Sequence, residues 1–307
     1  MKTIKPNYFD KFCCLKGNCK YSCCSAGWNI EVDATTLQKY SNSKDKYLQD
    51  TTNYIDFQNK NRCFKLETNR CVFLDSEGLC ELVKKHGNSY LCNVCRDYPR
   101  FYNFFSNRTE VGLSLDCEAV STIVLSENES FCLVSDDDNI KISRRDEADY
   151  NLRNDIFKIL TNKNKDFIKK LAEIKNLMSI ENLTFENLTC VMDEFEWLNF
   201  DGKKLVETLK QTDIKKDFFL NEKILENLMC YFVYRYLLNN NFGQTKKSKM
   251  KFCMFMVCLI DTMALLEVKD NTKIKQIVFV VQKICRQIEY SKNNVNFALN
   301  YFENKII

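Results

Sequence analysis

Cysteines are the residues of this chain whose type and spacing point most directly to chemistry. The 307 residues include 17 cysteines and a single histidine. A first block has the spacing Cys14-x4-Cys19-x3-Cys23-Cys24 and is closed by Trp28. Four thiols so close along the chain can converge only through tight loops. Neighbouring Cα atoms lie about 3.8 Å apart and their side chains diverge, so we expect only one of Cys23 and Cys24 to bind a given ion directly.

A second block begins with Cys71 and Cys80. The segment Asp75-Ser-Glu-Gly78 between them carries turn residues, so the two cysteines are expected to meet in a hairpin-like knuckle. A short helix is then expected from Cys80 to His86, ending at Gly87.

The same block continues with Cys92-x2-Cys95, and Cys117 follows later. A lone CxxC can be a thioredoxin-type redox pair, but no βαβ pattern surrounds this one, so the redox alternative is weak. Closer to the N-terminus, Asn29–Val32 alternates like a short strand, and Asp33 can cap a following helix.

Thiolates without imidazole indicate the class of metal. The N-terminal residues contain no signal-peptide pattern, so we expect a cytoplasmic protein in which disulfides are rare and clustered cysteines bind metal. All-thiolate sites suit zinc or iron–sulfur clusters. Zinc fills a closed structural site, whereas a cluster bound by three cysteines keeps an open iron for substrate. The chain has more cysteines than either site needs, so spacing alone leaves both open.

Composition excludes several other classes. The formal charge of +4 is too small for a dedicated nucleic-acid binder. Only 7 glycines and 2 prolines are present, which favours a mainly α protein over an all-β one. There is no G-x-G-x-x-G, so a doubly wound fold that binds its cofactor at a Gly-rich turn is not indicated. The most apolar stretch, Phe252–Ile260, stops at Asp261 and is too short to span a bilayer.

Helical periodicity dominates the second half of the chain. Phe167, Leu171, Ile174 and Met178 form one stripe, and a cleaner one comprises Ile274, Ile277, Val278, Val281, Ile284 and Ile288. The segments Ile224–Leu238 and Lys251–Val268 are apolar on several faces, as buried helices are. We expect Asn239–Lys249 to be a loop, and the isolated cysteines at 190, 230, 253, 258 and 285 to be core residues.

The polar stretch Ser135–Asp149 is the expected boundary. The fold class that follows is mainly α: a cysteine-rich metal-binding domain with short strands and loops at 1–134, followed by a helical domain at 150–307.

The two cysteine blocks together, with Cys71-Val-Phe-Leu and Cys95-Arg-Asp-Tyr-Pro-Arg100, resemble the flagellin lysine-N-methylase family over about residues 8 to 120. The same blocks resemble the CxxCxxCC group of zinc- or iron-chelating proteins. The matching cysteines are Cys14, Cys19, Cys23, Cys24, Cys71, Cys80, Cys95 and Cys117, whereas Cys13, Cys63 and Cys92 look additional. Val72 and Glu118 stand where the family usually has proline.

The resemblance implies a protein-lysine N-methyltransferase that acts on flagellin with S-adenosylmethionine and an iron–sulfur cluster, expected to be 4Fe–4S, with zinc as the alternative. Arg96 can clamp the cofactor carboxylate bidentately, or it can pair with Asp97 or Asp116. No catalytic residue and no oligomeric state is indicated. The rival function is a metal-chelating protein without enzymatic activity, and a structural zinc protein that mediates partner contacts also stays open.

Overall fold

The computed structural model describes residues 2–58, 61–136, 142–181, 185–197, 202–211 and 217–304. Contacts group the chain into two compact units. The helical unit comprises Met1–Phe12, Tyr102–Asp116 and Val120–Ile307, and the cysteine unit comprises Cys13–Phe101 and Cys117–Ala119. Helices labelled α1 to α13 dominate the described residues, with a few short strands, so the expected mainly α class is confirmed.

These units divide the chain differently from the 1–134 and 150–307 division expected from composition. The N-terminal residues and Tyr102–Asp116 join the helices, because the first strand pairs with a strand beyond residue 100. Within the expected boundary, Asp137 and Asp138 lie outside the described residues, while Leu133–Ser135 forms a strand.

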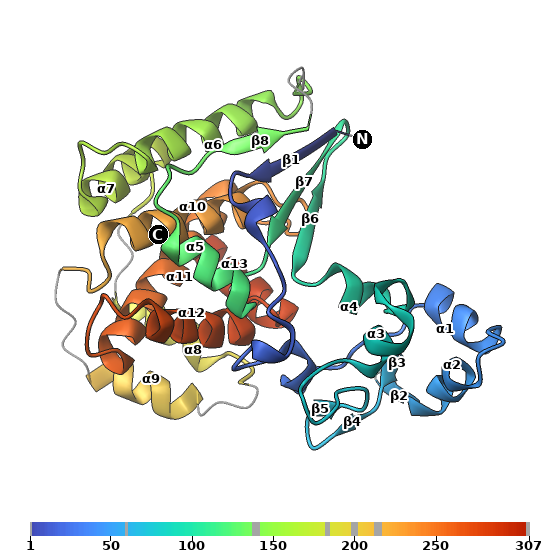
Figure 1. Ribbon diagram of the computed structural model, residues 1–307. Coiled ribbons are helices and arrows are strands. Elements are labelled where there is room, and N and C mark those ends of the chain that lie inside the picture. Colours follow the sequence, from blue (N-terminus) through green and yellow to red (C-terminus); the bar gives the residue numbers. More distant parts are fainter. Residues whose placement is uncertain are drawn as a thin grey trace. The chain divides into compact units, whose positions relative to one another are not determined.

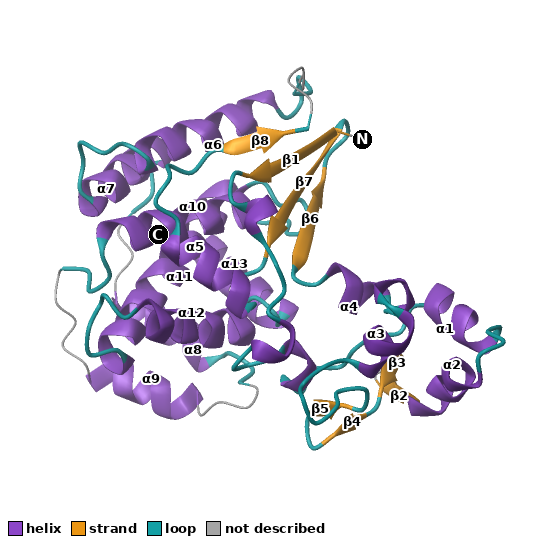
Figure 2. Ribbon diagram, viewed as in Figure 1, coloured by secondary structure: helices purple, strands orange, loops and turns teal. Residues whose placement is uncertain are grey.

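The cysteine unit is built from short elements (Figure 2). Its helices are α1 (Ala34–Ser41), α2 (Lys46–Thr51), α3 (Glu81–His86) and α4 (Asn93–Asp97). Its strands are β2 (Ile55–Gln58), β3 (Asn61–Phe64), β4 (Leu66–Glu67) and β5 (Arg70–Cys71), paired as β2–β3 and β4–β5. The expected strand Asn29–Val32 is reduced to a single bridge between Glu31 and Cys63.

A four-stranded sheet, which belongs to the helical unit except for the first two residues of β6, was not expected from the sequence. Its order is β6 (Arg100–Phe104), β7 (Arg108–Leu113), β1 (Lys2–Pro6) and β8 (Leu133–Ser135). Figure 1 shows β6, β7 and β1 side by side. Strand β1 pairs parallel with β7 and antiparallel with β8, so the N-terminal strand lies inside the sheet.

Helices supply most of the core of the helical unit. They are α5 (Glu118–Ser126), α6 (Glu147–Leu160), α7 (Phe167–Met178), α8 (Phe185–Asp193), α9 (Gly202–Gln211), α10 (Glu222–Phe232), the π-helix η6 (Val233–Leu237), α11 (Lys246–Glu267), α12 (Ile274–Ile288) and α13 (Lys292–Asn304). Both predicted stripes lie on helices, α7 and α12, and the two segments predicted as buried helices are indeed buried helices.

The prediction that Asn239–Lys249 is a loop is wrong for its last four residues. Helix α11 already begins at Lys246, because the Thr245 hydroxyl accepts the Ser248 N–H at 3.3 Å and caps it. Lys249 is therefore a buried helical residue and not part of a solvated loop.

The isolated cysteines pack mostly as expected. Cys230, Cys253 and Cys285 are fully buried, while Cys190 and Cys258 are half-buried. None of the helices in the described part of the chain is both long and apolar enough to cross a membrane.

Candidate functional site

The predicted knuckle between Cys71 and Cys80 is present. The Asp75 carboxylate accepts the N–H groups of Glu77 and Leu79 at 2.9 and 2.8 Å, and the Asp75 N–H donates to the Leu79 carbonyl. Gly78 has φ +74°, a left-handed conformation that glycine adopts without strain. The turn brings Leu74 and Cys80 into a bridge, and α3 follows directly, so this prediction is confirmed.

Asp33 joins two helices of the cysteine unit. Its carboxylate caps α1 by accepting the Thr36 N–H at 2.9 Å, and it accepts the Asn93 N–H at the start of α4, also at 2.9 Å. Burial opposes ionisation of this carboxyl, but these hydrogen bonds outweigh it and hold the pKa of Asp33 below its ordinary value. The predicted cap therefore also fixes the helix that carries Cys95.

Replacing Asp33 by alanine is expected to lower the free energy of unfolding of the cysteine unit by about 1 to 2 kcal/mol, because two N–H groups lose their acceptor. The pKa of Asp33 is lower in the folded protein, so its contribution is present above about pH 4 and is lost as the pH falls further. Urea unfolding at pH 7 measures the difference. Asp50→Ala, an exposed change on α2, is the control and should cost under about 0.5 kcal/mol; equal losses in both variants would contradict the double capping role.

Thiols from several segments gather in one hydrophobic cluster. Cys71 and Cys92 are buried within it, together with Tyr40, Phe64 and Phe73. The half-buried residues packed against it include Cys24, Cys80, Cys95 and Trp28. The Cys23 sulfur lies 4.0 Å from that of Cys24. We call Cys23, Cys24, Cys71, Cys80, Cys92 and Cys95 the thiol cluster.

The thiols influence one another's ionisation. Burial raises the pKa of Cys71 to about 11, and the neighbouring charges of Cys80, Cys92 and Cys23 add to this effect. A hydrogen bond between Cys92 and Cys95 lowers the pKa of Cys92 and raises that of Cys95, which burial raises further. Neighbouring thiolates repel one another because each carries a negative charge. A bound metal cation would relieve this repulsion, so these thiols are suited to bind one.

The donor set of the thiol cluster fits zinc or an iron–sulfur cluster in its chemistry, because all members are sulfur. The spacing of a coordination shell is not present: nowhere in the described ranges do three or more His, Cys, Asp or Glu side chains stand close enough to hold an ion.

The other predicted ligands lie outside the hydrophobic cluster. Cys14 is exposed, Cys19 is half-buried and Cys117 is buried. The loop between Cys14 and Cys19 packs on the knuckle turn, since a Cβ at Gly17 would lie 2.7 Å from the Glu77 carbonyl oxygen.

The loop that follows Cys19 is held by Glu118. The Glu118 carboxylate accepts the N–H groups of Lys20 and Tyr21 at 2.8 and 3.3 Å. These bonds fix the start of the Cys19–Cys23 loop beside the segment that contains Cys117.

Cys92 is the member of the thiol cluster that is not among the predicted ligands. It is fully buried and stands at the N-cap of α4, one helical turn before Cys95. The CxxC spacing itself was the signal that could have identified it.

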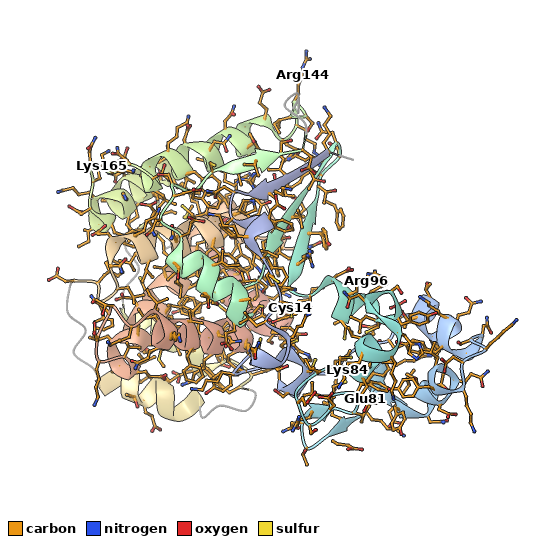
Figure 3. The ribbon with its side chains drawn as sticks, viewed as in Figure 1. Cys14, Glu81, Lys84, Arg96, Arg144 and Lys165 are labelled. Carbon is orange, nitrogen blue, oxygen red and sulfur yellow. The ribbon has the colours of Figure 1, made fainter. Side chains whose placement is uncertain are left out.

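Arg96 follows Cys95 on α4, and Figure 3 labels it there. Its Nε lies 3.3 Å from Asp97, and its Nη2 donates to Asn93 at 2.6 Å. Of the two structural partners considered, Asp97 is therefore the one that it contacts. The side chain is 48% exposed, and its role toward a cofactor stays a prediction.

A second polar group, in the helical unit, was not anticipated. Glu289, fully buried, accepts hydrogen bonds from Tyr231 at 3.1 Å and Tyr236 at 2.9 Å, and lies 3.2 Å from Arg235. Burial raises the pKa of Glu289, and Arg235 opposes the rise. Three of these residues lie at or beside the π-helix η6, a rare element that is frequent at functional sites. The sequence signal that could have revealed this group is the Tyr-x3-Arg-Tyr spacing within an apolar segment.

Comparison with known proteins identifies relatives. The chain is 30% identical over 136 residues to lysine-N-methylases of Salmonella typhimurium and Salmonella choleraesuis, and to the flagellar biosynthetic protein FliU of Salmonella muenchen. The match covers 42% of this chain, 34% of each of the first two proteins and 80% of FliU. The chain thus spans about a third of the length of the two lysine-N-methylases. No solved structure matches it.

A family model described as the FliB lysine N-methylase C-terminal domain matches residues 132–307, which make up more than half of the chain and lie in the helical unit. The protein therefore belongs to the FliB lysine N-methylase family.

Proposed function

We propose that this protein is a protein-lysine N-methyltransferase that uses S-adenosylmethionine, acts on flagellin and carries an iron–sulfur cluster. The observation that supports the proposal most is the thiol cluster, because it occurs in a chain whose relatives are named lysine-N-methylase and flagellar biosynthetic protein.

Cys71, Cys80, Cys92 and Cys95 are the proposed protein ligands, with Cys23 and Cys24 beside them. They come from the knuckle and from the start of α4, two segments that converge on one hydrophobic cluster. These four thiolates would complete the coordination of a 4Fe–4S cluster, so the methyl donor would bind beside the cluster and not to one of its irons. Zinc bound by the same thiolates is the alternative and would have a structural role.

Arg96 is the proposed contact to the carboxylate of S-adenosylmethionine. Asn93 and Asp97 orient its guanidinium through Nη2 and Nε, and half of the side chain is exposed. A guanidinium has five N–H donors, so donors remain for a carboxylate next to the ligand Cys95.

Methyl transfer places clear demands on the protein. The substrate ammonium must first lose a proton, since only a neutral amine carries the lone pair that attacks the methyl carbon. The N–C bond then forms as the S–C bond of the sulfonium breaks, which leaves S-adenosylhomocysteine and a methylated lysine. Positioning and deprotonation of the amine are therefore the catalytic tasks.

The proposal predicts that wild-type protein, purified without oxygen and incubated with flagellin and S-adenosylmethionine, adds increments of about 14 Da to lysine-containing peptides. Cys95→Ser should add none, because the proposed centre loses a ligand. Cys190→Ser, a half-buried thiol of the helical unit, should retain activity and is the matched control. Peptide mass spectrometry gives the readout.

Unmodified flagellin with fully metallated wild-type protein, across several flagellins, would reject the methylase proposal. The metal-chelating protein without enzymatic activity would then be the better description. The Arg96→Ala variant separates the two roles of that residue. Weaker binding of S-adenosylmethionine with the metal retained supports the carboxylate contact. Loss of stability with an unchanged affinity for S-adenosylmethionine contradicts it.

A further inference from the structure

The two edges of the four-stranded sheet differ in how well they are protected. The outer strands of this sheet are β6 and β8 (Figure 1). An edge strand carries backbone N–H and C=O groups that can pair with another chain, and proteins commonly protect such edges with short strands or with charged residues. Strand β8 has only three residues and is followed directly by Asp136. Strand β6 is longer, and its segment Tyr102–Phe104 contains no charged residue, so the edge at β6 is the less protected one.

The backbone of this segment directs hydrogen-bonding groups away from the rest of the sheet. The Phe105 N–H donates to the Arg108 carbonyl at 2.9 Å across the turn between β6 and β7, so the backbone of Phe105 faces β7. In an antiparallel pair, successive residues of a strand direct their N–H and C=O groups alternately toward and away from the neighbouring strand. Asn103 therefore faces β7, whereas the backbone groups of Tyr102 and Phe104 face outward. Among the described strands, none pairs with this outer side of β6.

The side chains of the same two residues form an exposed aromatic pair. Phe104 is 66% exposed and Tyr102 is 37% exposed. Their rings are stacked, with centroids 6.1 Å apart and an angle of 11° between the ring planes. The Asn103 side chain is buried on the opposite face, where its Nδ2 donates to the Arg235 carbonyl at 3.4 Å. Outward-facing backbone groups and exposed rings thus coincide on one short segment, which belongs to the helical unit.

We infer that β6 pairs antiparallel with β6 of a second copy of this chain. A two-fold axis beside Asn103 places Tyr102 opposite Phe104 of the second copy, and Phe104 opposite Tyr102 of the second copy. Each of these pairs exchanges two main-chain hydrogen bonds, because both residues direct their N–H and C=O groups outward. The four-stranded sheets of the two copies then form one continuous sheet. The inference does not depend on the methylase function.

The segment is complementary to a copy of itself. A two-fold contact brings a surface against its own equivalent, and here it brings uncharged aromatic residues against uncharged aromatic residues. Cross-strand aromatic pairs of this kind stabilise a sheet. Strand β6 contains no carboxylate that would select a lysine-containing peptide instead. The contact is much smaller than the roughly 800 Å² per partner of a standard interface, so we expect a weak, concentration-dependent dimer.

Sedimentation equilibrium of the full chain, purified without oxygen and kept in a reducing agent, tests this contact. The reducing agent prevents disulfides between chains through the exposed Cys13, Cys14 and Cys132. The average mass should rise from 36.3 kDa toward twice this value between micromolar and submillimolar protein concentrations. Phe104→Lys should weaken the association at least about ten-fold, because it places like charges near each other at the paired edge. Ile168→Lys is the matched control on α7, where Ile168 is 51% exposed, and should associate like wild type.

Amide hydrogen exchange, measured by NMR at low and at high protein concentration, tests the strand pairing directly. The N–H groups of Tyr102 and Phe104 should exchange several-fold more slowly at the high concentration, because they gain acceptors on the second copy. The N–H of Asn103 faces β7 and should change little. This alternation along three consecutive residues distinguishes strand pairing from a general loss of solvent access.

A mass of one chain throughout the concentration range would overturn the proposal, as would equal association of the Phe104→Lys and Ile168→Lys variants. A dimer with unchanged exchange at Tyr102 and Phe104 would also reject the strand pairing. If a flagellin peptide instead protected these two N–H groups in a monomeric protein, the edge would belong to an extended substrate and the assignment to a second copy would be wrong.

Discussion

Replacing Glu110 by glutamine is expected to remove about 3 to 5 kcal/mol from the free energy of unfolding of the helical unit. Glu110 is fully buried on β7. It accepts from Arg153 at 2.5 and 2.8 Å and from Arg108 at 3.0 Å, and both arginines are also fully buried. The glutamine variant keeps the shape of the side chain. Among the described residues it leaves Arg153 without a carboxylate partner and Arg108 with the carboxylate of Asp146.

The pH dependence gives this prediction a second readout. Burial opposes ionisation of Glu110, but Arg153 and Arg108 outweigh it and hold its pKa below the ordinary value. Its contribution is therefore present above about pH 4.3 and is lost as the pH falls through the lower folded-state pKa. The stability difference between wild type and Glu110→Gln should narrow in acid, as measured by denaturant unfolding at several pH values.

Glu207→Gln is the matched control for this prediction, because it makes the same change on the exposed face of α9. It should alter stability by less than about 0.5 kcal/mol. A Glu110→Gln variant as stable as this control would mean that the buried ion pairs contribute nothing net.

Cys92→Ser is expected to abolish metal binding, as are Cys71→Ser, Cys80→Ser and Cys95→Ser. A hydroxyl is a poor substitute for a thiolate toward zinc or iron, and Cys92 is buried within the hydrophobic cluster. Cys13→Ser is the control, because Cys13 is exposed and lies outside that cluster. Elemental analysis and acid-labile sulfide, measured on protein purified without oxygen, give the metal content per chain.

The same measurement identifies the metal. Iron and sulfide in comparable amounts are expected from the proposed cluster, whereas stoichiometric zinc without sulfide would favour the structural alternative. Full metal content in Cys92→Ser would show that the additional cysteine only fills the core. Equal metal loss in Cys13→Ser would show that the thiol cluster is not the metal-binding site.

Local features of the cysteine unit were predictable because neighbouring residues determine them. The turn from Asp75 to Gly78 and the cap at Asp33 follow from side chains that bond to backbone groups two to four residues away. The convergence of Cys71 and Cys92 was not predictable to the same degree. It depends on hydrophobic packing around Tyr40 and Phe64, which no spacing along the chain reports.

Long-range pairing was missed for a related reason. Strand β1 has only five residues and an unremarkable sequence, and its partner β7 lies far along the chain. The ion pairs of Glu110 with Arg153 likewise join distant segments. By contrast, the apolar stripe on α12 repeats over several helical turns, so the sequence alone predicts that helix.

The position of β1 inside the sheet affects how the polypeptide can reach its folded state. Residues 2–6 are synthesised before their partners in β7 and β8, which follow only after the whole segment Cys13–Phe101 has been made. Loop closure across that segment carries an entropic cost and slows the pairing. Early formation of the cysteine unit would shorten the effective loop. With the metal binding proposed for the thiol cluster, metal supply during translation should therefore influence how fast the sheet is completed.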